Sequence, residues 1–327
     1  MLDQTLPDQI QQVLDAVKLR DSVTEVYFVA CGGSYALMMP NQYLMDREAK
    51  AIAGFAVNSA EFTTRAPRRL GKSSVVVLCS HSGTTPETVL AAQTARAAGA
   101  LTIALTHVPD SPLDVASEHV IYYDHDPMTM SPQHSAAVVF RLSFGILATR
   151  EGNATAIEFD RALSEIGVIV AEVTAGHREK AVAFAAAHKR EPVIYTMASG
   201  TSYGVAYSYA ICIFQEMLWI HSAAINSGEY FHGPFEITDF DTPFLILLGL
   251  GNSRTMDERA VAFARKFSQR TTILDAQEFG LNRFNARIAD YLAPLVFTPL
   301  LRMYAERLAD AKGHPLTTRR YMWKMAY

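Results

Sequence analysis

The sequence predicts an α/β protein with two similar domains, each holding a mostly parallel sheet flanked by helices, and a C-terminal tail. Short apolar runs alternate with amphipathic helical segments, which is typical of a parallel sheet covered on both faces. The second half of the chain repeats motifs of the first half in the same order. The length of 327 residues provides for about two domains of ordinary size.

The first half of the chain shows strands and helices in alternation. Residues 3–20 place apolar side chains at helical spacing, and the stretches after Ser34 and after Thr85 have a similar pattern. Strands are predicted where short apolar runs stand between turn residues, at 23–30, 55–57, 74–79, 101–106 and 120–123. We therefore expect parallel strands whose connecting helices pack on the sheet.

The repeat is clearest where Tyr27 is laid over Tyr195, a shift of 168 residues. YFVACGGSY, which begins at Tyr27, and YTMASGTSY, which begins at Tyr195, then share five residues. SVVVLC has a counterpart in TPFLILLGLG, and LTIAL has one in TTILD. The predicted segments are an N-terminal helix, a first domain, connecting helices, a second domain, and a C-terminal helix with a tail, at 1–20, 21–150, 151–185, 186–290 and 291–327.

Charge and cysteine content limit the classes of function. The net charge of −4 provides no positive field to hold nucleic acid or an anionic membrane. Cys31, Cys79 and Cys212 are odd in number and far apart, which argues against a disulfide framework and a cysteine zinc site. The sequence has no H-E-x-x-H motif, no recognisable signal peptide and no membrane-spanning apolar run. We expect a cytoplasmic protein with no metal site.

The loop after the predicted strand 74–79 is a candidate anion site. It reads SHSGTT at 80–85 and leads directly into a helix. Free backbone N–H groups and the positive end of a helix dipole attract an anion at such a point, and hydroxyl side chains add donors. Ser34 follows the neighbouring strand, so both loops are expected at one edge of the sheet. The alternative is that these hydroxyls cap helices.

The type of anion follows from the motifs that are missing. Neither a P-loop nor a G-x-G-x-x-G fingerprint is present, so the sequence favours a monoester phosphate over a nucleotide. The corresponding loop of the second half, GLGNSR at 249–254, has lost most of the hydroxyls. We therefore expect the two halves to have divided their tasks.

Two residues of the second half are candidates for acid–base chemistry. Glu216 stands in the apolar helical run YAICIFQEMLWI, where an ionised carboxylate is costly unless it is paired or functional. Its alternatives are a solvated helix face or a salt bridge. His232 stands in the loop-like segment GEYFHGP and is able to transfer protons near neutral pH. The alternative for His232 is a structural role.

The motifs CGGSY and SHSGTTPET, with a related domain in the other half, resemble the sugar isomerase (SIS) family of phosphosugar-binding proteins. The resemblance covers nearly the whole chain and implies two tandem SIS domains. Within that family the chain is similar to the isomerase part of glucosamine-6-phosphate synthase. It is more similar to the bacterial deglycases that act on 6-phosphorylated fructose-amino acids, through FQEMLWIHSAAINSGEYFHGPFEIT at 214–238 and HPLTTRRYMWK at 314–324.

The resemblance also implies roles for individual residues. It makes Glu216 the base that moves a proton and His232 the residue that assists ring opening, the latter supplied by the neighbouring subunit of a homodimer. His81 stands where the synthase has glutamine in its phosphate loop, and Glu229 positions the loop or the substrate. The tail closes over the sugar site in relatives, so Arg319 and Lys324 are expected to contact the carboxylate or the phosphate of the substrate. The residues implied to bind the sugar phosphate are Gly33, Ser34, Ser80, His81, Ser82 and Thr85.

The function implied is cleavage of a phosphorylated fructose-amino acid into glucose 6-phosphate and a free amino acid, with no cofactor. One alternative is a glucosamine-6-phosphate isomerase or deaminase. Synthesis from glutamine is disfavoured because Met1-Leu2-Asp3 leads directly into this domain, without a glutaminase domain. A second alternative is a non-catalytic phosphosugar sensor, against which the presence of both Glu216 and His232 argues.

Overall fold

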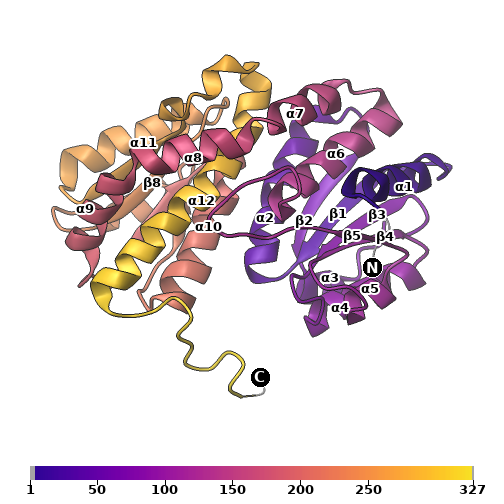
Figure 1. Cartoon of the computed structure of the whole chain (residues 1–327), viewed down its shortest axis with the longest axis horizontal. Coiled ribbons are helices and arrows are strands. Elements are labelled where there is room, and N and C mark those ends of the chain that lie inside the picture. The colour runs from indigo at the N-terminus through magenta and orange to yellow at the C-terminus, as the bar shows by residue number, and fades with distance from the viewer. Residues whose placement is uncertain (1–3, 326–327) are drawn as a thin grey trace. The chain divides into compact units, whose positions relative to one another are not determined.

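The chain is described by a computed structural model that covers residues 4–325 and divides into two compact units (Figure 1). Unit 1 holds the described residues up to Asp126 together with Ser131–Ser164. Unit 2 holds Pro127–Met130 and the chain from Glu165 onward. Each unit is built on one parallel sheet flanked by helices, so the predicted α/β class is confirmed.

Unit 1 contains a five-stranded sheet in the order β2-β1-β3-β4-β5, with every neighbouring pair parallel. Its strands are β1 (Glu25–Ala30), β2 (Ala53–Asn58), β3 (Ser74–Cys79), β4 (Leu101–Thr106) and β5 (His119–Tyr122). Its helices are α1 (Leu6–Lys18), α2 (Gly32–Glu48), α3 (Ser59–Arg65), α4 (Pro86–Ala97), α5 (Pro112–Ala116), α6 (Ser135–Glu151) and α7 (Thr155–Leu163). The five strand predictions for the first half are confirmed, with ends that differ by one or two residues in three of them.

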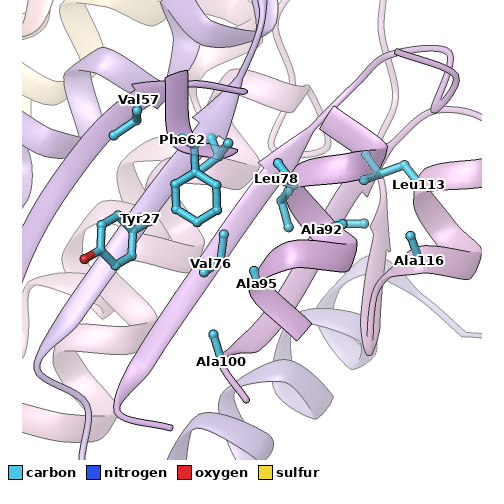
Figure 2. Close-up of a cluster of buried hydrophobic side chains, with 13 residues drawn as sticks. Tyr27, Val57, Phe62, Val76, Leu78, Ala92, Ala95, Ala100, Leu113 and Ala116 are labelled. Atoms are coloured by element: carbon cyan, nitrogen blue, oxygen red, sulfur yellow. The ribbon is translucent and has the colours of Figure 1, made fainter. Parts of the chain in front are cut away.

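The core of unit 1 explains why its strands are continuous apolar runs. All residues of β1, β3 and β4 are buried, because helices cover both faces of the sheet. On one face Tyr27 and Val76 pack against Phe62 of α3 and the small side chains of α4 and α5 (Figure 2). α1 and α2 each contact both α6 and the sheet, and the three helices form a second helical group. The strand ends are therefore the part of the sheet open to a ligand.

Unit 2 contains a four-stranded parallel sheet in the order β7-β6-β8-β9. Its strands are β6 (Tyr195–Ala198), β7 (Ala224–Asn226), β8 (Phe244–Leu248) and β9 (Thr271–Asp275). Its α-helices are α8 (Ile166–Gly176), α9 (Arg178–His188), α10 (Tyr203–Ser208), α11 (Arg254–Phe267) and α12 (Ala286–Lys312). A π-helix, η2, spans Tyr209–Met217, and four 3-10 turns are η1 (Gly200–Ser202), η3 (Pro234–Ile237), η4 (Ala276–Phe279) and η5 (Leu281–Arg283).

The two sheets share one strand order. β6, β8 and β9 carry the sequences that repeat those of β1, β3 and β4, and they take the same positions in their sheet. β7 stands beside β6 as β2 stands beside β1. The repeat in the sequence therefore corresponds to a repeat in topology.

The helices between the two sheets do not form a body of their own. Residues 151–185 are predicted as connecting helices, but α7 belongs to unit 1, whereas α8 and α9 belong to unit 2. α8 and α9 pack against α12, whose apolar side chains are buried over most of its length. The predicted C-terminal helix thus begins at Ala286 and is part of the core of unit 2. Within residues 4–325, no helix is both long enough and apolar enough to cross a bilayer.

Candidate active site

The two hydroxyl-bearing loops of unit 1 meet at one edge of the sheet. β1 and β3 are neighbours, with Ala30 opposite Cys79, so the loops that follow them begin side by side. Ser34 lies close enough to Cys79, the residue before Ser80, to lower the pKa of the Cys79 thiol against the larger rise caused by burial. α2 and α4 begin at these loops, so the positive ends of two helices lie at the same edge.

The SHSGTT loop is ordered by its own hydroxyls. Ser80 Oγ and Thr85 Oγ1 lie 2.8 Å apart, and Ser82 Oγ lies 2.7 Å from Thr84 Oγ1. Thr85 occupies the N-cap position of α4, but its side chain does not cap the helix. The capping alternative therefore does not describe Thr85, whose hydroxyl bonds across the loop instead. The loop presents hydroxyls from both of its ends.

Glycine is required at Gly83 in the middle of this loop. Its φ is +66°, in the left-handed region that favours glycine, and a Cβ at this position would collide with the Ser111 side chain. The Gly83 carbonyl accepts a hydrogen bond of 2.9 Å from the Leu113 N–H, which fixes the loop to α5. Gly33 is exposed at the start of α2, next to Gly32 with φ of +55°.

His81 is only partly exposed, and its ring belongs to a cluster of aromatic side chains. Its Nδ1 lies 3.3 Å from the Tyr123 hydroxyl, and its ring stacks on His107 at 5.0 Å with an interplanar angle of 8°. The His125 ring lies 4.8 Å away, and His134 packs against His125 at 5.2 Å. Burial and the two neighbouring imidazoles lower the pKa of His81. These surroundings therefore disfavour the charged form of the imidazole.

The corresponding loop of unit 2 has a carboxylate in place of the lost hydroxyls. Asp257, in the first turn of α11, is buried. It accepts a hydrogen bond of 2.6 Å from Ser227 Oγ and one of 3.4 Å from the Gly249 N–H. Burial raises the pKa of Asp257. A carboxyl group of the chain itself thus lies at this strand end.

Glu216 lies in the π-helix η2, which runs on from α10. π-helices are rare, and they occur frequently at functional sites. The carboxylate is half-buried at a cavity of about 760 Å³. Polar and aromatic side chains from η2, the segment after it and the tail line this cavity, among them Gln215, Glu216, Trp219, His221, Arg319 and Arg320.

Glu216 is paired with Arg319 of the C-terminal tail. Arg319 Nη2 lies 2.8 Å from Glu216 Oε1. Burial raises the pKa of Glu216, and the Arg319 guanidinium opposes that rise. Burial and the charge of Glu216 raise the pKa of the nearby Cys212 thiol to about 11. Of the alternatives open for Glu216 from the sequence, the salt bridge is the one observed, and it coexists with exposure to the cavity.

The tail is folded around the Arg319 side chain. Arg319 is only 8 % exposed, and its Nη1 donates to the carbonyl oxygens of Leu316 and Thr318 at 2.6 and 3.0 Å. Lys324 Nζ donates to the Arg319 carbonyl at 2.5 Å. The Arg319 guanidinium also lies over the Trp323 ring. Arg319 and Lys324, which are expected to contact the substrate, therefore also stabilise the conformation of the tail.

His232 and Glu229 lie in the turn-rich segment after β7. Both side chains are exposed, and the His232 N–H donates to the Glu229 carbonyl at 2.9 Å. Gly233 next to them has φ of +134°. Among the described residues, neither side chain forms a hydrogen bond or ion pair, and neither lines the cavity at Glu216. Their surfaces are open to a partner.

A metal centre is not indicated by the arrangement of side chains. Within residues 4–325, no group of three or more His, Cys, Asp and Glu side chains is placed to hold a metal ion. Of the imidazoles around His81, His107 stacks on its ring, whereas His125 is tilted to it by 57°.

Known proteins similar to this chain give its family. The SIS domain model matches residues 18–143. Fructosamine deglycase FrlB of Bacillus subtilis strain 168 is 46% identical over 319 residues, which is 98% of this chain and 97% of that protein. The chain belongs to the SIS family. The resemblance noted from CGGSY and SHSGTTPET is thereby confirmed.

Two further matches extend the comparison. Fructoselysine 6-phosphate deglycase of Escherichia coli K12 is 29% identical, over 95% of this chain and 89% of its own length. A crystal structure from Bacillus subtilis, described as that of a phosphosugar isomerase, matches with a TM-score of 0.93 and 46% identity, over 98% of this chain and 97% of that one. The likeness therefore extends through both units.

Some residues of this SIS protein are prominent only in the structure. His107 and His125 follow β4 and β5 and reach His81 because those strands lie beside β3 in the sheet. The rule that ligands bind at the carboxyl ends of parallel strands points to both positions. His221 and Gln215 line the cavity at Glu216, and no pattern in the sequence distinguishes them.

Proposed function

We propose that this SIS protein is a deglycase that cleaves a 6-phosphorylated fructose-amino acid to glucose 6-phosphate and the free amino acid. The observation that carries the proposal is the 46% identity to a fructosamine deglycase over 98% of the chain. The second relative is named for a 6-phosphorylated fructose-lysine, which supports a substrate of that class.

The phosphate group is bound in this proposal by the two loops of unit 1. The helix N-termini at Gly32 and Pro86 supply partial positive charge, and Ser34, Ser80 and Ser82 supply hydroxyl donors. Gly33, His81 and Thr85 complete the proposed set. Binding energy from the phosphate, which takes no part in the bond changes, orients the reacting carbons.

The chemical step in this proposal is proton transfer by Glu216. After ring opening, the carboxylate removes the proton from C1, next to the C2 carbonyl, and an enolamine forms. The proton returns at C2, and the double bond shifts to give the C1 Schiff base of glucose 6-phosphate with the amino acid. Water then hydrolyses the Schiff base. A half-buried carboxylate with a raised pKa is suited to this two-way transfer.

The other proposed parts concern the assembly and its setting. His232 assists ring opening from the neighbouring subunit of a homodimer, with Glu229 positioning its loop.

Unit 2 is a second SIS domain, a proposal supported by the strand order that it shares with unit 1. We keep the boundaries 21–150 and 186–290 for the two domains. The three free cysteines suit a reducing, cytoplasmic setting.

The test is release of glucose 6-phosphate, followed by a coupled dehydrogenase, from a panel of fructose-amino acid 6-phosphates. Fructose 6-phosphate and glucosamine 6-phosphate serve as controls. We expect release from at least one conjugate, and the panel ranks the leaving amino acids. Release of fructose 6-phosphate from glucosamine 6-phosphate, detected by adding phosphoglucose isomerase to the coupled assay, with no release from the conjugates, would identify a deaminase. Binding without turnover of any compound would identify a sensor.

A further inference from the structure

The imidazole cluster around His81 contains three residues to which the proposed function gives no role, His107, His125 and His134. His81 lies in the loop proposed to bind phosphate, between Ser80 and Ser82. His107 and His125 reach it from the ends of β4 and β5, and His134 packs behind His125. These imidazoles lie at one edge of the sheet, beside the proposed phosphate site, so a bound anion is expected to affect their charge.

The two phosphate loops contain no fixed positive charge. Neither the segment 31–35 nor the segment 80–87 includes a lysine or an arginine. A monoester phosphate is a dianion near neutral pH, because its second pKa is about 6. Helix dipoles supply only part of a unit charge each. An imidazole in the loop is the group able to supply a full countercharge, provided that it takes up a proton.

The surroundings of His81 allow both of its charge states. The Tyr123 hydroxyl at Nδ1 donates to a neutral ring and accepts from a protonated one. The groups that face the ring are His107, His125 and Tyr123, and no carboxylate is among them. Asp126 raises the pKa of His134, the ring that packs behind His125. These neighbours therefore do little to hold a proton on His81.

His134 is the buried member of the cluster, and its surroundings disfavour a proton on its ring. It is only 5 % exposed, its Nδ1 accepts from the Ala136 N–H at 3.2 Å, and its Nε2 is buried without a partner. Burial and the neighbouring His125 lower the pKa of His134 to about 4. A proton that enters the cluster near neutral pH thus goes to a ring nearer the loop.

We propose that His81 takes up a proton from solvent when a phosphate monoester binds beside it, and that the imidazolium then donates a hydrogen bond to the phosphate. This inference rests on the proposed phosphate site but not on the deglycase reaction. For each phosphate group that binds, one proton passes from bulk water or buffer to the His81 ring. Linkage requires that binding weakens as the pH rises above neutrality, because the proton becomes harder to supply.

The experiment is calorimetry with glucose 6-phosphate at pH 7.5, in HEPES and in Tris, whose ionisation enthalpies differ. The dependence of the heat on the buffer gives the number of protons taken up. We expect about half to one proton for the unaltered protein, and close to none for His81→Gln. Affinity at this pH falls roughly 10-fold in that variant, the usual scale for a charged hydrogen bond. Thermal unfolding is the folding control for His81→Gln, and its midpoint is expected to stay close to that of the unaltered protein because the residue is partly exposed.

His107→Gln is the matched variant within the cluster, since glutamine is able to keep a bond to the Tyr123 carbonyl that His107 Nδ1 contacts at 2.9 Å. Retained uptake in this variant supports the assignment to His81. Uptake lost in His107→Gln but kept in His81→Gln would overturn it, as would binding by the unaltered protein with no uptake. Absence of any glucose 6-phosphate binding would overturn the phosphate site itself, whatever the deglycase assay shows.

Discussion

Arg319 and Glu216 form an ion pair of 2.8 Å at the cavity, although 102 residues lie between them in the chain. The guanidinium is buried and held by carbonyls of its own tail, so it is a fixed partner for the carboxylate. Resemblance assigns Arg319 to the substrate, and the structure shows that it also faces the proposed base. The tail therefore influences the charge of Glu216 directly.

The first prediction concerns the pH dependence of turnover in Arg319→Gln. Burial raises the pKa of Glu216 and Arg319 lowers it, so loss of the guanidinium raises that pKa further. A base must be deprotonated, so the acidic limb of kcat/KM moves to higher pH, by about 1 to 2 units. The measurement is a pH–rate profile of glucose 6-phosphate release. Arg320→Gln is the control, because Arg320 lies over the Trp219 ring and leaves the ion pair intact. An unmoved limb in Arg319→Gln would show that the pair does not tune the base.

The second prediction concerns the base itself. Glu216→Gln removes the proton acceptor but keeps the shape and a hydrogen-bond acceptor for Arg319. Turnover falls by at least ~100-fold, the usual scale for losing a general base. Affinity for glucose 6-phosphate and the unfolding midpoint stay close to those of the unaltered protein. Near-normal turnover in this variant would discard the mechanism.

The third prediction concerns the phosphate loop. Ser82→Ala removes an exposed hydroxyl that bonds within the loop to Thr84. Calorimetry with glucose 6-phosphate is expected to show an affinity about 10-fold lower, because one donor to a charged group is lost. Thr94→Ala, near the opposite end of α4, bonds only within its helix and serves as the control. Equal affinity of the two variants would remove Ser82 from the site.

The fourth prediction concerns the glycine of the same loop. Gly83→Ala introduces a Cβ that collides with Ser111 at a φ of +66°. Gly313→Ala is the control, because its φ is +62° and a Cβ there meets nothing within 4 Å. Urea unfolding is expected to show a loss of about 1 kcal/mol in the free energy of unfolding for Gly313→Ala and at least twice that for Gly83→Ala. Similar losses would mean that the loop relaxes away from Ser111.

The fifth prediction concerns the proposed homodimer. If each site combines Glu216 of one subunit with His232 of the other, then a hybrid of Glu216→Gln and His232→Gln subunits has one intact site. Random mixing makes half of the dimers hybrid, so activity recovers to about a quarter of the normal value. The measurement is glucose 6-phosphate release before and after the two inactive variants are unfolded and refolded together. Proteins refolded separately are the control. No recovery would argue that His232 acts within its own subunit or not at all.

The sequence alone predicts most of the framework of unit 1. The runs at 74–79 and 101–106 become β3 and β4 without change, because a strand buried on both faces must be apolar throughout. The position of SHSGTT between a strand and a helix likewise predicts its place at the edge of the sheet. The shift between Tyr27 and Tyr195 predicts the second sheet, although residues 151–185 divide between the units instead of standing apart.

The sequence by itself therefore determined the α/β class, the repeat and the loops, since these depend on local periodicity and on residues next to one another. Only the tertiary structure decided that Arg319 pairs with Glu216 and that His107 and His125 surround His81. Those contacts depend on where a tail folds back and on which strands become neighbours in the sheet. No local sequence pattern predicts these contacts, because both depend on how the whole unit packs.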